Sequence, residues 1–339
     1  MSRSLKLGLQ LGYWHAAPPE NPVGLAQDVE RLGFDSVWTA EAWGSDAFTP
    51  LAWVGAHTSK LRLGTSVVQI SARTPTATAM AALTLDHLSG GRAMLGLGVS
   101  SPQVVEGWYG QPFAKPLART REYLDIIRQV LCREHPVAND GPHYPLPYTG
   151  EGSWGMGKSL RSITHPLRPD LPIFLGAEGP KNVALAAEIA DGWLPLYYSP
   201  FRPEIYRESL GKAKPGFEIT QFVMVNITDD IDAALLPVKA MLGFYIGGMG
   251  AAKRNFHVEL MSRMGFEAEA HEIQKLFLEG RREEAVAAVP GEFADEISLC
   301  GPRERIAERL EAWKQTPVTS LLIANQDLDT LRTMAELLL

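Results

Sequence analysis

At 339 residues, with 45% hydrophobic and 21% charged residues, the chain has the composition of a globular protein that buries a large core. Its net charge of −7 supplies no basic surface of the kind that binds nucleic acid or anionic lipid, so we expect neither partner. The chain has only 2 cysteines, and no set of His, Cys, Asp and Glu has metal-ligand spacing. We therefore expect neither a disulfide framework nor a metal site.

The length fits one domain, because α/β barrels run to several hundred residues as a single unit. We expect that unit to span residues 1–339. The first residues lack the apolar stretch of a signal peptide, and no uninterrupted apolar run is long enough to cross a bilayer. These features predict a cytoplasmic location.

Short apolar runs alternate with helical segments along the chain. The predicted strands are Leu5–Leu11, Ser36–Thr39, Leu61–Val68, Arg92–Leu97, Pro172–Leu175, Gly192–Leu196, Glu218–Asn226 and Ser320–Ala324. The predicted helices between them are Pro22–Leu32, Phe48–Thr58, Pro75–Leu88, Thr120–Leu131 and Pro180–Ala190. This alternation predicts a parallel sheet, and about eight strands favour closure into a (β/α)8 TIM barrel, with an open doubly wound sheet as the structural alternative.

Two segments interrupt the alternation. Residues from about 134 to 170 are rich in Pro, Gly, Tyr and His without a sustained period, which predicts an irregular loop. Residues from about 229 to 293 form a helical insertion late in the chain, broken near residues 247–250. We expect the loop and the part of the insertion around Gly247 to Arg254 to shape the binding pocket.

The segments that leave strands form the active face of such a barrel. Glu41 follows a buried strand, where a carboxylate is costly unless it is paired, and His15 follows the first strand. The sharpest local pattern is Gly176-Ala177-Glu178-Gly179-Pro180, in which small residues and a proline at a helix start favour a bound phosphate. An ordinary strand-to-helix turn is the alternative, and an inward Glu178 would repel an anion.

Other reaction classes find little support. Gly96-Leu97-Gly98 lacks the third glycine of a dinucleotide fingerprint, and neither a nucleophile elbow nor a Walker loop occurs. A barrel lyase would need a Schiff-base lysine at a strand end, and the predicted strand ends provide none.

Four strand-end segments carry a family resemblance. They are Leu9 to Trp14, Val37 to Glu41, Leu63 to Val67 and Leu95 to Val99, supported by residues 83–92, Gly176 to Pro180, residues 190–193 and Gly301-Pro302. Together they closely resemble the luciferase-like monooxygenase superfamily, and within it the branch that uses the deazaflavin coenzyme F420. The resemblance covers nearly the whole chain in order.

The resemblance implies a bacterial-luciferase-like barrel, a homodimer and a cofactor ring over the strand ends. It implies a non-prolyl cis peptide at Ser66-Val67 behind the ring, with Gly98 to Ser100 along the ring or ribityl chain and Gly176 to Pro180 around the phosphate. The cofactor-binding candidates are Tyr13, Glu41, Ser66, Val67, Gly98, Val99, Ser100, Gly176, Ala177, Glu178, Gly179, Pro180 and Trp193. Glu41 and His15 are the catalytic candidates, for proton relay or substrate polarisation, and Tyr13, Trp43, Trp108 and Tyr109 are the expected walls.

The sequence departs from relatives in this branch at two positions. Its sugar-phosphate dehydrogenases carry an Asp-His pair after the second strand and an acid after the fourth, where this chain has Glu41-Ala42 and Ser101. The expected activity is hydride transfer between F420 and a small organic substrate. An FMN-dependent monooxygenase is the alternative, although such enzymes tend to place an arginine where Val99 stands, and a cofactor-binding barrel without turnover is another.

Overall fold

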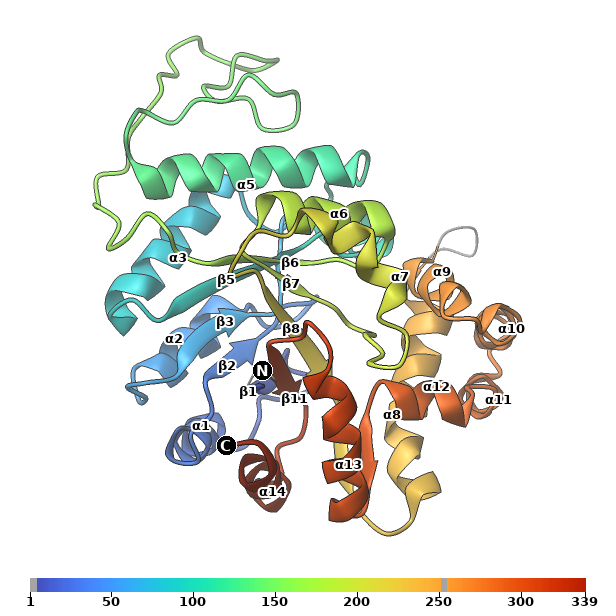
Figure 1. Cartoon of the computed structure of the whole chain (residues 1–339). Coiled ribbons are helices and arrows are strands. Elements are labelled where there is room, and N and C mark those ends of the chain that lie inside the picture. The colour runs from blue at the N-terminus through green and yellow to red at the C-terminus, as the bar shows by residue number, and fades with distance from the viewer. Residues whose placement is uncertain (1–4, 251–254) are drawn as a thin grey trace.

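The computed structural model describes residues 5–250 and 255–339, and nine strands of it form one sheet (Figure 1). They are β1 Lys6–Gly12, β2 Ser36–Thr39, β3 Arg62–Thr65, β4 Val68–Gln69, β5 Ala93–Gly98, β6 Ile173–Gly176, β7 Gly192–Leu194, β8 Glu218–Val223 and β11 Ser320–Ile323. All neighbouring pairs are parallel, and pairing of Leu63 with Ala93 joins β3 to β5. The sheet therefore closes, and β3 and β4 together occupy one of the eight barrel positions.

Helices surround the barrel on the outside, as in a (β/α)8 fold (Figure 1). The ring and its connections contain α1 Pro22–Arg31, α2 Phe48–Gly55, α3 Pro75–Ser89, α4 Pro102–Gly107, α5 Pro116–Cys132, α6 Pro180–Ile189, α7 Glu204–Arg207, the 3-10 helix η1 Ser209–Lys212, α13 Arg303–Lys314 and α14 Leu328–Leu338. The predicted TIM barrel is confirmed, and the open sheet is excluded.

Two aromatic side chains fill the inside of the barrel. Trp38 and Phe174 meet edge to face, with ring centroids 5.4 Å apart, in a buried cluster with Met94. Gly64 and Gly192 leave the space for them: a Cβ at these positions would lie 2.2 Å from Trp38 and 2.3 Å from Phe174. The interior is thus a packed core that closes the barrel beneath the strand ends.

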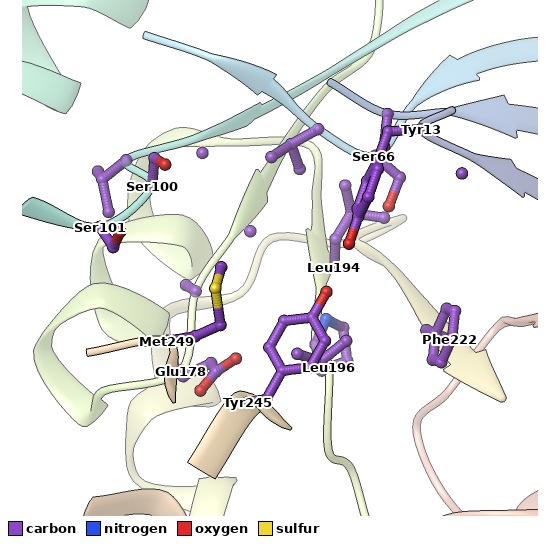
Figure 2. Close-up of a pocket in the computed structure, with 18 of the residues that line it drawn as sticks. Tyr13, Ser66, Ser100, Ser101, Glu178, Leu194, Leu196, Phe222, Tyr245 and Met249 are labelled. Carbon is purple, nitrogen blue, oxygen red and sulfur yellow. The ribbon is translucent and has the colours of Figure 1, made fainter. Parts of the chain in front are cut away.

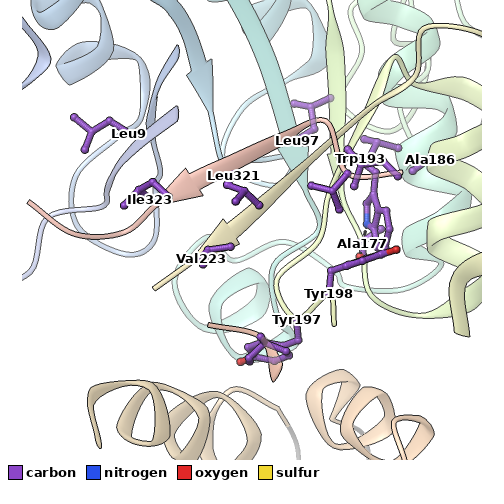
Figure 3. Close-up of a cluster of buried hydrophobic side chains, with 14 of the residues drawn as sticks. Leu9, Leu97, Ala177, Ala186, Trp193, Tyr197, Tyr198, Val223, Leu321 and Ile323 are labelled. Atoms are coloured by element: carbon purple, nitrogen blue, oxygen red, sulfur yellow. Dashed lines mark hydrogen bonds between the residues drawn. The ribbon is translucent and has the colours of Figure 1, made fainter. Parts of the chain in front are cut away.

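A second hydrophobic layer lies between the strands and the helices (Figure 3). Leu9, Leu97, Leu321 and Ile323 from the strands are all buried in it. Because these strands are covered on both sides, their sequences are almost continuously apolar, which is why the strands were predictable.

The helical insertion follows β8. It contains β9 Val225–Ile227, α8 Ile231–Gly248, α9 Phe256–Arg263, α10 Glu267–Leu278, α11 Arg282–Ala287, α12 Gly291–Glu296 and β10 Leu299–Gly301. By length and mean hydropathy α8 alone among the described helices could cross a membrane; in the structure it packs against α10, α11 and α12, and 39% of it is buried. Figure 1 shows these helices grouped beside the barrel.

Residues 134–170, all within the described chain, contain no helix or strand, only an isolated bridge between Asn139 and Leu146. This segment projects beyond α5 as an extended loop (Figure 1). Its apolar side chains are unusually exposed, with Trp154 at 90% and Ile163 at 95% of full accessibility.

Candidate functional site

A cavity of about 1220 Å³ opens at the carboxyl ends of the barrel strands. Its walls come from the ends of β1, β5, β6, β7 and β8, from the connection between β3 and β4, and from α8 and α9 of the insertion. The active face of the barrel and the insertion therefore enclose one space, part of which is drawn in Figure 2.

The floor of the cavity is the break in the third strand. The peptide between Ser66 and Val67 is cis, as the resemblance implied. A Cβ on Gly98 would lie 2.5 Å from Val67 Cγ2, and one on Gly176 would lie 3.2 Å from Val67 Cγ1. The two glycines thus leave the space that the Val67 side chain occupies, and all three residues line the cavity here.

One end of the cavity is suited to an anion. It is lined by the first turns of α5 and α6, residues 115–118 and 179–182. Neither N-cap residue caps its helix with a side chain, and Pro116 and Pro180 have no N–H. Asn182 donates to the backbone oxygen of Gly179, so the N–H groups of Leu117, Ala118 and Lys181 remain for a ligand at the positive ends of the two helix dipoles. Lys115 and Lys181 add positive charge, and neither forms an ion pair with another described residue.

Glu178 lies in the same loop, but its carboxylate is engaged by the insertion. Its Oε2 lies 2.9 Å from Nδ1 of His257 on α9, close enough for an ion pair although the two atoms are not aligned as a hydrogen bond. Arg263 donates a hydrogen bond of 2.8 Å to the backbone oxygen of Glu178. The Glu178 carboxylate is thus directed toward side chains of α9. The backbone N–H groups of the loop can still bind an anion.

Two tyrosines meet across the cavity. Tyr13 follows β1 and Tyr245 lies near the end of α8, and Figure 2 shows their hydroxyls facing each other. Burial raises the pKa of Tyr245, and its interaction with Tyr13 raises it further. Tyr245 is therefore a neutral hydroxyl at physiological pH. His15 lies beside Tyr13 with ring centroids 5.3 Å apart and is itself exposed.

Twelve of the candidate residues line the cavity: Tyr13, His15, Ser66, Val67, Gly98, Val99, Ser100, Gly176, Ala177, Glu178, Gly179 and Pro180. Glu41 and Trp193 do not. The carboxylate of Glu41 accepts hydrogen bonds from Arg73 and from the backbone N–H of Gln69. These contacts join segments of the barrel to one another and do not reach the cavity. Trp193 is fully buried and donates to the backbone oxygen of Ala177 at 2.7 Å, which holds the loop after β6 from behind.

Two further expectations were wrong, because neither the loop at residues 134–170 nor three of the four expected aromatic walls contribute to the described cavity lining. Trp43, Trp108 and Tyr109 are absent from the described cavity lining, and Tyr109 instead donates to the backbone oxygen of Ala42 at 3.1 Å. The insertion also carries two basic residues that would attract an acidic cofactor tail, Lys253 and Arg254, and both lie outside the described residues.

Sequence reasoning missed several cavity residues. Lys115 was missed because α5 was predicted to begin at Thr120, although Pro116 is a typical residue for a first helical turn and marks the true start. Tyr245 and His257 belong to the insertion, and nothing in their local sequence shows that α8 and α9 fold over the strand ends.

Residues 7–320 match the family model of the luciferase-like monooxygenases. The chain belongs to this family. A protein of Mycobacterium tuberculosis that is named as a coenzyme F420-dependent oxidoreductase is 56% identical to this luciferase-like chain, over 99% of the chain and 100% of the relative.

Solved structures share the fold of this luciferase-like protein. The coenzyme F420-dependent tetrahydromethanopterin reductase of Methanopyrus kandleri superposes with a TM-score of 0.79 at 21% identity, covering 98% of both chains. An F420-dependent secondary alcohol dehydrogenase, solved with an F420-acetone adduct, superposes with a TM-score of 0.76 at 17% identity over 98% of both chains.

Proposed function

We propose that this luciferase-like protein is a coenzyme F420-dependent oxidoreductase that transfers a hydride between the deazaflavin and a small organic substrate. The observation that carries the proposal is one continuous cavity, which joins the floor at the cis peptide Ser66-Val67 to an anion-binding end at α5 and α6. A planar ring with a phosphate-bearing chain matches this shape. The 56% identity to the mycobacterial relative supports the choice of cofactor.

The residues present fit the cofactor. Val67, Gly98 and Val99 would support the ring, and the backbone from Gly176 to Pro180 would hold the phosphate with help from Lys115. When bound, the deazaflavin accepts or donates a hydride at its C5 atom. The protein orients the reactants and excludes water, mainly through apolar side chains at the other end of the cavity.

FMN is the alternative cofactor on this fold. The described cavity lining contains no arginine, and its cations are the lysines at 115 and 181. The half-buried Val99 lines the cavity where flavin-dependent relatives tend to carry a phosphate-binding arginine. This composition favours F420.

For the assembly, the proposal is a cytoplasmic homodimer. Its support is the family resemblance, together with the exposed Trp53 and Met80 on the neighbouring helices α2 and α3. Sedimentation equilibrium of the purified protein would measure the state, and a monomer at micromolar concentration would refute this part.

Fluorescence titration of the purified protein with F420 tests the proposal, with Gly98→Ala as the diagnostic variant. The new methyl group would lie 2.5 Å from Val67 and displace the floor of the cavity. We expect an affinity loss of about tenfold or more, since misplacement of a binding surface costs on the order of 1.4 kcal/mol or more. Gly107→Ala is the matched control, because nothing lies within 4 Å of its Cβ position.

Reduction of the bound cofactor separates an enzyme from a storage protein. The complex with reduced F420 should be oxidised in a single turnover by a suitable substrate. Binding of F420 without oxidation by any substrate would favour the barrel without turnover, and tight binding of FMN with none of F420 would overturn the cofactor assignment.

A further inference from the structure

The cavity, about 1220 Å³ in volume, extends beyond the floor at Ser66-Val67 and the starts of α5 and α6 to side chains of the insertion. Where the ends of β7 and β8 meet α8, the cavity is lined by apolar side chains, Leu196, Phe222, Met224, Met241 and Met249. We call this part the apolar compartment, and Figure 2 shows several of its side chains around Tyr245.

Tyr13 and Tyr245 bring hydroxyls to the apolar compartment. The two hydroxyls face each other, and each carries one proton. At most one hydrogen bond can form between them, and it uses only one of the two protons. At least one O–H proton of the pair is then left without an acceptor among the described residues. A ligand oxygen in the compartment would supply the missing acceptor.

The charges around the compartment restrict the ligand. The carboxylate of Glu178 acts on Tyr245 and lies 2.9 Å from His257 Nδ1, whereas Lys115 and Lys181 lie at the anion end. A carboxylate or phosphate substrate would meet negative charge here, so a neutral substrate is favoured. An apolar body fits the lining, and an oxygen fits the hydroxyls.

We propose that the Tyr13–Tyr245 pair binds the oxygen of a neutral, largely apolar carbonyl or alcohol substrate and exchanges a proton with it. This inference rests on the proposed function and names its substrate class. The two hydroxyls take the part that the sequence assigned to Glu41, whose carboxylate is turned toward Arg73.

The step balances in the reducing direction. The carbonyl carbon takes a hydride, with its two electrons, from reduced F420, and the C=O π bond opens. The oxygen takes the phenolic proton, so that a C–H and an O–H bond form and the alcohol results. After loss of the hydride the cofactor would release the second proton of its reduced form to water, and the phenolate regains a proton from water by way of Tyr13 and the exposed His15 beside it. In the oxidising direction every transfer is reversed.

A non-reducible carbonyl tests the binding part without turnover. Cyclohexanecarboxamide presents an acceptor oxygen on an apolar ring, and its affinity for the protein loaded with oxidised F420 is measured by calorimetry. We expect Tyr245→Phe and Tyr13→Phe each to weaken binding about 3- to 10-fold, the range of one hydrogen bond. Tyr148→Phe is the matched control, since Tyr148 lies on the exposed loop and bonds only to the backbone of Glu151.

Turnover tests the proton transfer. With reduced F420 and a panel of aldehydes and ketones that includes cyclohexanone, the wild-type protein should reduce at least one member. Each Tyr→Phe variant should lower kcat by about 10²- to 10⁴-fold, the usual contribution of a general acid. F420 affinity should stay at the wild-type value in Tyr245→Phe and Tyr148→Phe.

The possible failures are distinguishable. Lack of F420 binding by the wild-type protein would refute the proposed function. Three results would refute the role of the tyrosine pair while leaving F420 binding intact. They are failure of the protein to reduce any carbonyl of the panel, failure of the amide to bind, and behaviour of Tyr245→Phe and Tyr13→Phe like that of Tyr148→Phe.

Discussion

Replacing Glu41 by glutamine and Arg73 by methionine, singly and together, shows whether this carboxylate supports the fold or the reaction. The Glu41 side chain is 3% exposed and the Arg73 side chain 24% exposed. Glu41 Oε1 accepts hydrogen bonds of 2.8 Å from Arg73 Nη1 and from the backbone N–H of Gln69, and Oε2 accepts a third of 2.8 Å from Arg73. The pair joins the end of β2 to the segment before α3.

The magnitudes follow from burial. Arg73→Met leaves a buried carboxylate without its counter-charge, which costs about 3–5 kcal/mol of unfolding free energy. Glu41→Gln leaves Arg73 with access to water, so we expect a smaller loss of about 1.5–3 kcal/mol. Because the two residues are in contact, the double variant should lose less than the sum, by about 1–3 kcal/mol.

Urea unfolding measures the three stabilities, and F420 titration with turnover measures function in the same samples. Each folded variant should bind F420 as the wild-type protein does and keep most of its turnover. A Glu41→Gln variant with wild-type stability and abolished turnover would refute the structural assignment and restore Glu41 as a catalytic residue.

Two further predictions concern the barrel itself. Burial raises the pKa of Glu218, but hydrogen bonding and charge from Arg62, with Lys6, outweigh it and leave this pKa below its usual 4.5. The ionised Glu218 therefore stabilises the fold fully above pH 4.5, and this stabilisation is lost as the pH falls through the native pKa. In acid titrations the unfolding free energy of Glu218→Gln should fall less steeply below about pH 4.5 than that of the wild-type protein. An unchanged slope would contradict this. Gly96→Ala would place a Cβ 1.9 Å from the backbone oxygen of Thr65, and we expect thermal unfolding to show a loss of at least about 3 kcal/mol; a wild-type melting temperature would show that the strands can move apart.

Much of the barrel was predictable because its strands are short, fully buried apolar runs. The predicted strand boundaries were wrong where the pairing of a strand depends on residues far away in the sequence. The predicted strand Leu61–Val68 is interrupted at Ser66, where the chain turns to form the cavity floor. The predicted strand Glu218–Asn226 divides because its last part, β9, leaves the barrel and pairs with β10.

The sequence predicted which loops form the site but not which of their side chains enter the cavity. Position at a strand end places a residue on the active face but does not give the direction of its side chain. Glu41 is the clearest case, since its partner Arg73 lies 32 residues further along the chain. Tyr245 comes from the insertion, and its approach to Tyr13 depends on how α8 packs over the barrel.

Competition between F420 and FMN for the purified wild-type protein, followed by F420 fluorescence in equilibrium dialysis, tests the central claim most directly. The cavity should take up one F420 per chain, and a large excess of FMN should displace little of it. Retention of FMN with no uptake of F420 would contradict the account.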